Sequence, residues 1–311
     1  MQRKITVTGA NKVFFWVIII FLGFSYAIGI LSVLLRKNIA TDNFHITIII
    51  TQFVLILLPV LIYVLKNRLN FKEVFRLNKL GLLPAFIIVI NSIFAILAAG
   101  SLNVIVLFLL QQIGKVPPDS IPVPKSFSEM LITLLVLSIS PAICEEALHR
   151  GILLRSYEKR GTIKAIVISS IMFGIFHFDI KNLLGPIFLG MVIAYYVVRT
   201  NSIFAGVLAH FSNNAIASIS SYLVGGSETD SAPITLADLE NQLIFGMGCF
   251  IVMVILLAVF KKVTQDTAQY NPPIASVRND IKSILSHWPI VVVLVLYIIS
   301  ALMTIVSQVL T

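Results

Sequence analysis

The chain has 311 residues, of which 58% are apolar and 12% are charged, whereas charged residues make up about 25% of an ordinary soluble domain. A soluble fold cannot conceal that much apolar surface, because its exterior has to face water. The composition therefore predicts an integral membrane protein. The two cysteines, Cys144 and Cys249, both lie in apolar runs, which excludes a secreted, disulfide-rich class. The net charge of +9 fits positively charged cytoplasmic loops better than nucleic-acid binding.

A transmembrane helix needs about 20 apolar residues, and nine stretches of the sequence reach or approach that length. They are 13–35, 44–65, 80–110, 128–157, 163–178, 183–198, 202–224, 242–260 and 287–310. We therefore predict an all-α fold, a polytopic membrane helix bundle of about eight to nine transmembrane helices. Because no long polar segment interrupts the pattern, residues 1–311 are expected to form a single membrane domain.

The distribution of lysine and arginine predicts the orientation of the bundle. If the N-terminus is cytoplasmic, 17 of the 23 basic residues fall on the cytoplasmic side and five on the other, while Arg150 lies inside a span. This bias predicts a cytoplasmic N-terminus. The segment Gly225–Asn241 carries four acidic residues and no lysine or arginine, as expected for the opposite side.

A few ionisable and amide side chains fall inside the predicted spans, where they are costly and mark functional sites. These are Glu145, Glu146, His149, Arg150, His177, His210, Asn213 and Asn214. At 1.5 Å per residue, Glu146 and His177 lie roughly 20 Å from the predicted cytoplasmic edge and His210 roughly 16 Å. Three helices thus bring polar groups to a similar depth, which predicts one polar pocket within the bundle.

The spacing of the polar residues predicts which of them share a helix face. Glu146 and Arg150 are four residues apart, so we expect an intrahelical ion pair. Glu145 is rotated by about 100° from Glu146 and has no cation on its own face. Pro141 removes a backbone hydrogen bond one turn before Glu145 and is expected to kink the helix there.

These residue types match the requirements of a hydrolase that adds water to a carbonyl group. A carboxylate in a poorly solvated pocket becomes a stronger base and can take a proton from water and return it to a leaving amine. A neutral imidazole can orient the same water or bind a metal ion. A histidine and an asparagine one turn apart can donate hydrogen bonds to an oxyanion.

Three motifs occur in order on three apolar segments: Glu145-Glu146-Ala-Leu-His-Arg150, Phe173-Gly-Ile-Phe-His177 and His210-Phe-Ser-Asn-Asn214. This set resembles the CAAX protease and bacteriocin-processing (CPBP, or Abi) family of intramembrane endopeptidases, which includes the type II CAAX prenyl endopeptidases. The resemblance covers residues 125–224, the expected catalytic helix core. Residues 1–124 and 225–311 are expected to supply flanking spans.

The resemblance implies an intramembrane endopeptidase in which Glu145 and His177 activate water. It further implies that His210 and Asn214 stabilise the oxyanion, and that Glu146 and Arg150 support the architecture. It leaves a glutamate-dependent and a metal-dependent mechanism open. Zinc, if present, would be bound by Glu145, His177 and His210, since catalytic zinc commonly takes three protein ligands and a water molecule. The absence of a second carboxylate to orient the rings favours a site without tightly bound metal.

The expected partners are the lipid bilayer and a membrane-associated peptide or protein substrate, with no nucleic acid. The composition, rich in lysine and isoleucine, favours a bacterial source and hence the bacterial plasma membrane. Two other functions use the same residues. One is a non-catalytic membrane immunity or signalling partner of the same fold, and the other is a transporter with a proton relay of buried acids. The absence of visible inverted repeats argues against the transporter.

Overall fold

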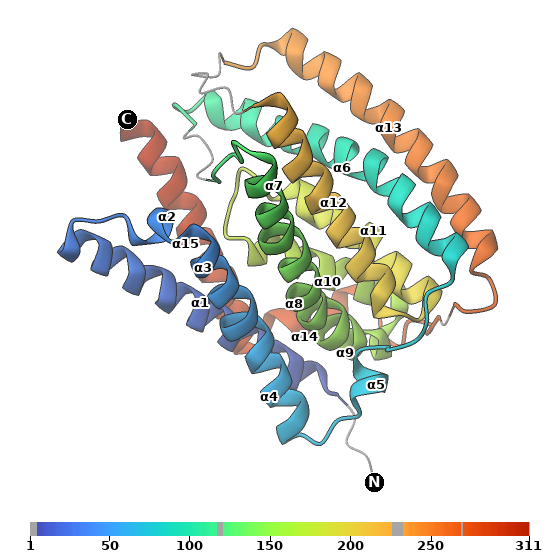
Figure 1. Cartoon of the computed structure of the whole chain (residues 1–311). Coiled ribbons are helices and arrows are strands. Elements are labelled where there is room, and N and C mark those ends of the chain that lie inside the picture. Colours follow the sequence, from blue (N-terminus) through green and yellow to red (C-terminus); the bar gives the residue numbers. More distant parts are fainter. Residues whose placement is uncertain (1–4, 117–120, 226–232, 269, 311) are drawn as a thin grey trace.

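The computed structural model describes residues 5–116, 121–225, 233–268 and 270–310, and every regular element in these ranges is a helix. The predicted all-α class is therefore confirmed for the described residues. Part of the acidic segment 225–241 lies outside them. The longer helices run roughly lengthwise through the molecule, with the N-terminus at one end of the bundle and the C-terminus at the other (Figure 1).

Each of the nine apolar stretches coincides with a helix or a continuous series of helices. The first three comprise α1 (Val7–Leu35), then α3 (Phe44–Ile49), η1 (Ile50–Leu57) and α4 (Leu58–Lys66), then α6 (Leu82–Gln111). The fourth comprises α7 (Phe127–Thr133), η2 (Leu134–Ile139), α8 (Ser140–Glu146), η3 (Ala147–Leu154), α9 (Arg155–Tyr157) and η4 (Glu158–Arg160). The other five are α10 (Thr162–Phe176), α11 (Leu184–Thr200), α12 (Ile203–Val224), α13 (Leu236–Val263) and α15 (Trp288–Leu310). The short helices α2 (Ile39–Asp42), α5 (Phe71–Val74) and α14 (Val277–Leu285) lie between the apolar stretches.

Within the described residues, six helical stretches are long and apolar enough to cross a membrane, so the predicted count of eight to nine is not confirmed. They are Val7–Leu35, Phe44–Lys66, Leu82–Gln111, Phe127–Arg160, Leu236–Val263 and Trp288–Leu310. α10 and α11 have 15 and 17 residues, which cover about 22 and 26 Å of a hydrocarbon core about 30 Å thick. α12 is long enough to cross a membrane, with 22 residues, but its serines, asparagines and histidine make it less apolar than the six stretches named above.

Three segments of the bundle are π-helical, and all three lie in the second and fourth spans: η1, η2 and η3. A π-turn is rare and occurs mostly at functional sites, because its wider hydrogen-bond ring shifts the side chains that follow. η2 ends at Ile139 and α8 begins at the next residue, Ser140. Pro141 lies in the first turn of α8. The helix type thus changes beside Pro141, while the expected kink there stays a prediction. Glu145 and Glu146 lie between η2 and η3.

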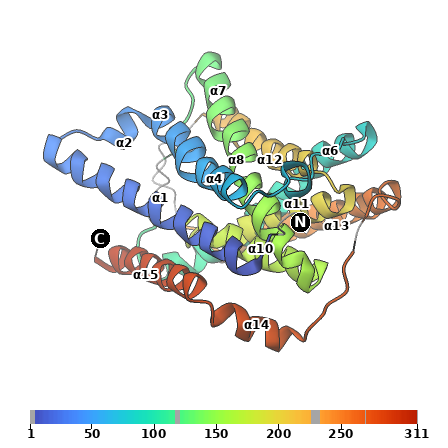
Figure 2. The ribbon, with the colours of Figure 1, turned by 90° about the horizontal axis from the view of Figure 1, so that it is seen from below.

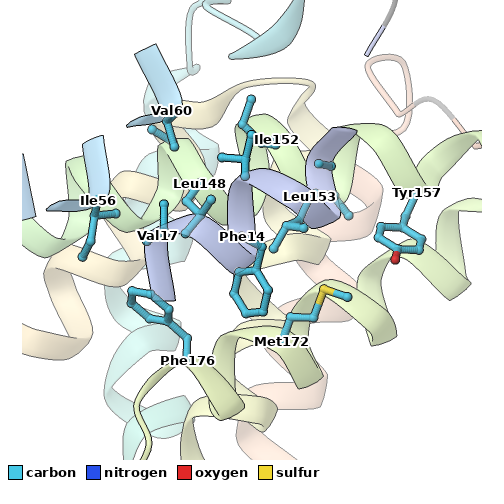
Figure 3. Close-up of a cluster of buried hydrophobic side chains, with 14 of the residues drawn as sticks. Phe14, Val17, Ile56, Val60, Leu148, Ile152, Leu153, Tyr157, Met172 and Phe176 are labelled. Carbon is cyan, nitrogen blue, oxygen red and sulfur yellow. The ribbon is translucent and has the colours of Figure 1, made fainter. Parts of the chain in front are cut away.

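The main hydrophobic core holds the first half of α1 against the fourth span and α10. Phe14 and Val17 of α1 pack with Leu148, Leu153 and Met172 (Figure 3). The buried residues of α1 end at Ile18, and the rest of this helix leans away from the bundle (Figures 1 and 2). Its outer half exposes large apolar side chains such as Tyr26 and Val33, as expected for a surface that faces lipid.

A second core cluster joins α6, α11, α12 and α13 around Tyr196 and Phe260. At the predicted cytoplasmic end, polar contacts join elements far apart in the sequence. Arg76, before α6, pairs with Glu158, and Asp280 of α14 pairs with Arg160 and Lys164 at 2.5 Å each. α14 lies along the outside of the bundle between α13 and α15 (Figure 2), and the Asp280 pairs hold it there.

Candidate active site

The three sequence motifs lie on α8 with η3, on α10 and on α12, and these elements pack against one another. Glu145 and Glu146 end α8, and Arg150 follows on η3. His177 caps the C-terminal end of α10, and His210 lies in the middle of α12. The predicted convergence of the motifs is therefore observed for the helices that carry them.

Glu146 is fully buried and binds two cationic or potentially cationic groups. Its Oε1 atom accepts a hydrogen bond from Arg150 Nη1 at 3.0 Å, so the predicted intrahelical ion pair is present. The same oxygen is 2.9 Å from His210 Nδ1. Because a carboxylate only accepts hydrogen bonds, Nδ1 carries the proton and donates. Glu146 thus fixes the ring orientation of His210, so the expectation that no second carboxylate orients the histidine rings is wrong for His210.

Arg150 is held on three sides. It binds Glu146, its Nη2 donates to the carbonyl oxygen of Gly190 on α11 at 3.0 Å, and the guanidinium lies 4.8 Å from the centre of the Phe173 ring.

Gly206 of α12 lies directly beside the carboxylate of Glu146. A Cβ atom at this glycine would be 2.7 Å from Glu146 Oε2, so the glycine allows α12 to approach α8 closely.

Glu145 has a different environment from its neighbour. Its Oε1 accepts a hydrogen bond from Gln52 Nε2 at 2.8 Å. Its Oε2 is buried and has no hydrogen-bond partner among the described residues. Nε2 of His210 lies 4.0 Å from this oxygen. Glu145 therefore has one oxygen that is fixed and one that is available for a reaction.

Phe173 lies at the centre of a group of three histidines. The ring centres of His149, His177 and His210 are 4.9, 5.0 and 5.5 Å from that of Phe173, each edge to face. His149 is fully buried, and its Nδ1 donates to the backbone oxygen of Glu145 at 2.9 Å. The aromatic ring therefore sets the spacing between the three imidazoles.

His177 lies at the exposed edge of this group. Its Nδ1 donates to the backbone oxygen of Phe173 at 2.8 Å, and its side chain is exposed. Among the described residues, no hydrogen bond or ion pair joins His177 to Glu145, and the imidazole that approaches Glu145 is that of His210. The sequence motif could not reveal this arrangement, because an equal depth in the membrane does not specify the direction in which a ring points.

Asn214 lies one turn beyond His210 on α12. One hydrogen of its Nδ2 is donated to the backbone oxygen of Leu137 at 3.0 Å, which leaves the other for a ligand. The side chain is half-buried. Asn213 is buried, and its Oδ1 has no partner among the described residues.

The donor set expected for zinc is not assembled in this structure. No group of three or more His, Cys, Asp or Glu side chains in the described ranges is close enough to hold a metal ion. Glu145 and His210 approach each other, but His177 does not complete the set. The arrangement does not fit a three-ligand zinc site, and no catalytic step is assigned to a metal here.

Gln52 is the site residue that the motifs do not identify. The only signal in the sequence is a single amide in the middle of the second apolar stretch, which also suits a simple contact between helices. Its partner, Glu145, is 93 residues further along the chain, so the pairing depends on how η1 packs against α8.

Comparisons with known proteins agree with the motif segment. Residues 127–216 match the family model of the Rce1-like type II CAAX prenyl endopeptidases. A protein of Bacillus subtilis (strain 168) named "Putative membrane peptidase YdiL" is 37% identical over 84 residues, which are 27% of this chain and 34% of that protein. The matched segment thus spans about a third of the length of the curated relative. No solved structure matches the chain. The resemblance inferred from the three motifs is therefore confirmed for this segment, and the chain is an integral membrane protein similar to membrane peptidases.

Proposed function

We propose that this protein is an intramembrane endopeptidase that hydrolyses a peptide bond of a membrane-associated protein or peptide. The observation that carries the proposal is the buried, unpartnered Oε2 of Glu145, which lies 4.0 Å from Nε2 of His210. Both atoms lie within the segment that resembles the peptidase family. A distance of 4.0 Å is too long for a direct hydrogen bond and suits two groups that hold a small molecule between them.

The two facing atoms are both hydrogen-bond acceptors. Oε2 belongs to a carboxylate, and we take His210 as a neutral imidazole, in which the proton donated from Nδ1 to Glu146 leaves Nε2 with a lone pair. Two acceptors that face each other require a molecule with two donor hydrogens, and water meets this requirement. We therefore place the nucleophilic water between Glu145 and His210.

In the reaction, the oxygen of this water forms a bond to the carbonyl carbon of the substrate, and its proton moves to Glu145 Oε2. The carbonyl π electrons move to the oxygen, which becomes an oxyanion. The free Nδ2 hydrogen of Asn214 is the proposed donor to this oxyanion. When the carbon–nitrogen bond breaks, Glu145 returns the proton to the leaving amine. The second proton of the water stays on the attacking oxygen, so the products are a carboxylic acid, which ionises on release by giving its proton to solvent, and an amine.

The remaining motif residues are proposed to support these steps. Glu146 and Arg150 orient His210 and hold α12 against α8 through the contacts at 2.9 and 3.0 Å. His177, at the exposed edge of the Phe173 group, is proposed to contact the substrate or the water as it enters. The predicted partnership of His177 with Glu145 would then require the rings to move when substrate binds.

The substrate class follows from the position of the site. Glu145 and His210 are buried in helices that lie among the apolar spans, so a substrate has to reach them from the membrane or its surface. We propose the plasma membrane of a bacterium as the location, with the N-terminus in the cytoplasm. A maturing peptide suits such a host better than a prenylated protein.

Purified protein in detergent or proteoliposomes, incubated with quenched fluorescent membrane-anchored peptides, tests the function directly. Glu145→Gln keeps the acceptor for Gln52 but cannot take a proton, so cleavage should fall by about 10²–10⁴ while the melting temperature is unchanged. Asp266→Asn, at an exposed position between α13 and α14, is the control. Equal cleavage by wild type and Glu145→Gln would remove Glu145 as the base, and no cleavage by wild type would favour the immunity or signalling partner.

A further inference from the structure

Gln52 lies outside the segment matched by the peptidase family, and its side chain contacts Glu145, the proposed base. Its Nε2 donates to Glu145 Oε1 at 2.8 Å, and both side chains are buried, with 6% of each residue exposed. A hydrogen bond to an ionised group is stronger than a hydrogen bond between two neutral groups. The contact is therefore strong enough to determine how the carboxylate is oriented.

The backbone around Gln52 is arranged for this contact. Gln52 lies in η1, the π-helical part of the second span. Thr51, Gln52, Leu55 and Ile56 are the buried residues of η1, and η1 packs against α8. The π-helical turns thus place one amide among apolar neighbours, directed at the end of α8 that carries the two glutamates.

We propose that Gln52 is a positioning residue of the active site, which fixes Oε1 of Glu145 so that Oε2 faces His210. This inference rests on the proposed peptidase function for its catalytic meaning. Without the amide, the carboxylate can rotate about its terminal torsion, which is broad and nearly two-fold. The water would then lose one of its two fixed acceptors for part of the time.

Other ionisable groups around Glu145 cannot replace this contact. The elements packed against α8 are η1, η2, η3 and α12. η1 and η2 contain no ionisable residue. His149 uses Nδ1 for the backbone of Glu145, Arg150 binds Glu146 and Gly190, and His210 is 4.0 Å away. Cys144 and Glu146 are its neighbours on α8. Among the described residues, Gln52 is the one side chain that donates a hydrogen bond to this carboxylate.

The competing explanation is a contact that only joins two helices. Asn91 provides a matched control, because its Nδ2 donates to Tyr196 Oη at 2.6 Å and both groups are buried. Gln52→Met and Asn91→Leu each remove one buried amide hydrogen bond and keep an apolar side chain of similar size. A purely structural role predicts the same changes in both variants.

The test compares pH profiles of kcat and KM for wild type, Gln52→Met and Asn91→Leu. In Gln52→Met, we expect kcat to fall about tenfold or more, KM to stay nearly constant, and the acidic limb of kcat to move up by about one pH unit. The limb moves up because the hydrogen bond favours the ionised carboxylate. Asn91→Leu should leave the limb in place. An unmoved limb in Gln52→Met overturns the inference.

A second variant covers the case in which Gln52→Met does not fold. In Gln52→Glu, the introduced carboxyl group can donate the same hydrogen bond while it is protonated, whereas two ionised carboxylates repel each other. This variant should therefore retain activity at acid pH and acquire an alkaline limb that wild type lacks. A profile that keeps the wild-type shape would contradict the positioning role.

Infrared spectroscopy separates this inference from the proposed function. The protonated carboxyl band of Glu145, identified by its absence in Glu145→Gln, can be titrated in protein that cleaves nothing. An upward shift of its midpoint in Gln52→Met, without any cleavage in wild type, supports the positioning contact while it rejects the peptidase. An unchanged midpoint rejects the contact whether or not the protein cleaves.

Discussion

Nε2 of His210 lies 4.0 Å from Oε2 of Glu145, while Nδ1 of the same ring binds Glu146 at 2.9 Å. The two adjacent glutamates therefore face opposite nitrogens of one imidazole, and Glu146 alone is within hydrogen-bond distance. In the proposed mechanism, Glu146 orients the ring and Glu145 acts as the base, although the two are neighbours in the sequence.

This division of roles predicts that both glutamine variants lose cleavage but that only one of them loses stability. Glu146→Gln leaves Arg150 buried without its charged partner, and breaking such a pair costs about 3–5 kcal/mol. We expect a clear fall in melting temperature and in expression, together with loss of cleavage. Glu145→Gln is the matched control and should melt like wild type. Equal melting temperatures for the two variants would remove the structural role of Glu146.

Gly206 offers a test of the close approach between α12 and α8. A Cβ atom here would be 2.7 Å from Glu146 Oε2 and 2.7 Å from Val197 Cγ2. Gly206→Ala should push α12 away and carry His210, one turn further on, out of contact with Glu146. A displacement of about 1 Å can cost about 10²-fold in rate, which peptide cleavage would measure.

The matched control for this variant is Gly248→Ala in α13, where a Cβ atom would have no neighbour within 4 Å. Alanine favours a helix over glycine by about 0.8–1.0 kcal/mol, so this control should be neutral or slightly more stable. If Gly206→Ala behaves in the same way, α12 does not depend on contact at this glycine.

The helices and the motif convergence were predictable because they depend on local patterns. Apolar length identifies the spans, and the four-residue spacing of Glu146 and Arg150 fixes their pairing whatever surrounds them. The count of membrane-crossing helices is less accessible. α10 is mostly apolar but only 15 residues long, and the point at which a helix ends depends on the turn that follows.

The contacts of Glu145 could not be predicted from the sequence. Gln52 reaches it through a π-helical segment, and an apolar run does not indicate whether its hydrogen bonds connect residues four or five apart. The family resemblance implies that His177 acts beside Glu145, whereas the structure places His177 at the exposed end of α10 and His210 nearer the carboxylate. The direction in which a side chain points around its helix axis depends on how that helix packs against several neighbouring helices at once.

Asp280 predicts a pH-dependent contribution to stability at the predicted cytoplasmic end. Burial acts to raise the pKa of Asp280, but hydrogen bonds from Lys164 and Arg160, together with their charges, lower it overall. A lowered pKa in the folded state contributes stability above the unfolded value of about 3.9, and this stability is lost as pH falls through the folded pKa. Asp280→Asn should therefore lower the melting temperature at pH 7 and reduce its dependence on pH below about 4.

Asp266→Asn serves as the control for this measurement, because Asp266 is exposed between α13 and α14, the helix that carries Asp280. Its melting profile should follow wild type. If Asp280→Asn also follows wild type at every pH, the two ion pairs do not hold α14 in place.

The proposed active site is expected to work without tightly bound zinc. Catalytic zinc commonly needs three protein ligands, and the described residues do not bring three candidate donors together. Glu145 Oε1 is already bound by Gln52, and Nδ1 of His210 by Glu146, which leaves one oxygen and one nitrogen for a ligand. These two suit a water molecule without a third donor. We therefore expect purified active protein to retain its activity after chelation and dialysis, with less than one equivalent of zinc by elemental analysis.

One equivalent of zinc per chain, with activity lost on chelation and restored by zinc, would place Glu145, His177 and His210 in a ligand shell. That result would also require His177 to move from its present position at the end of α10 toward Glu145.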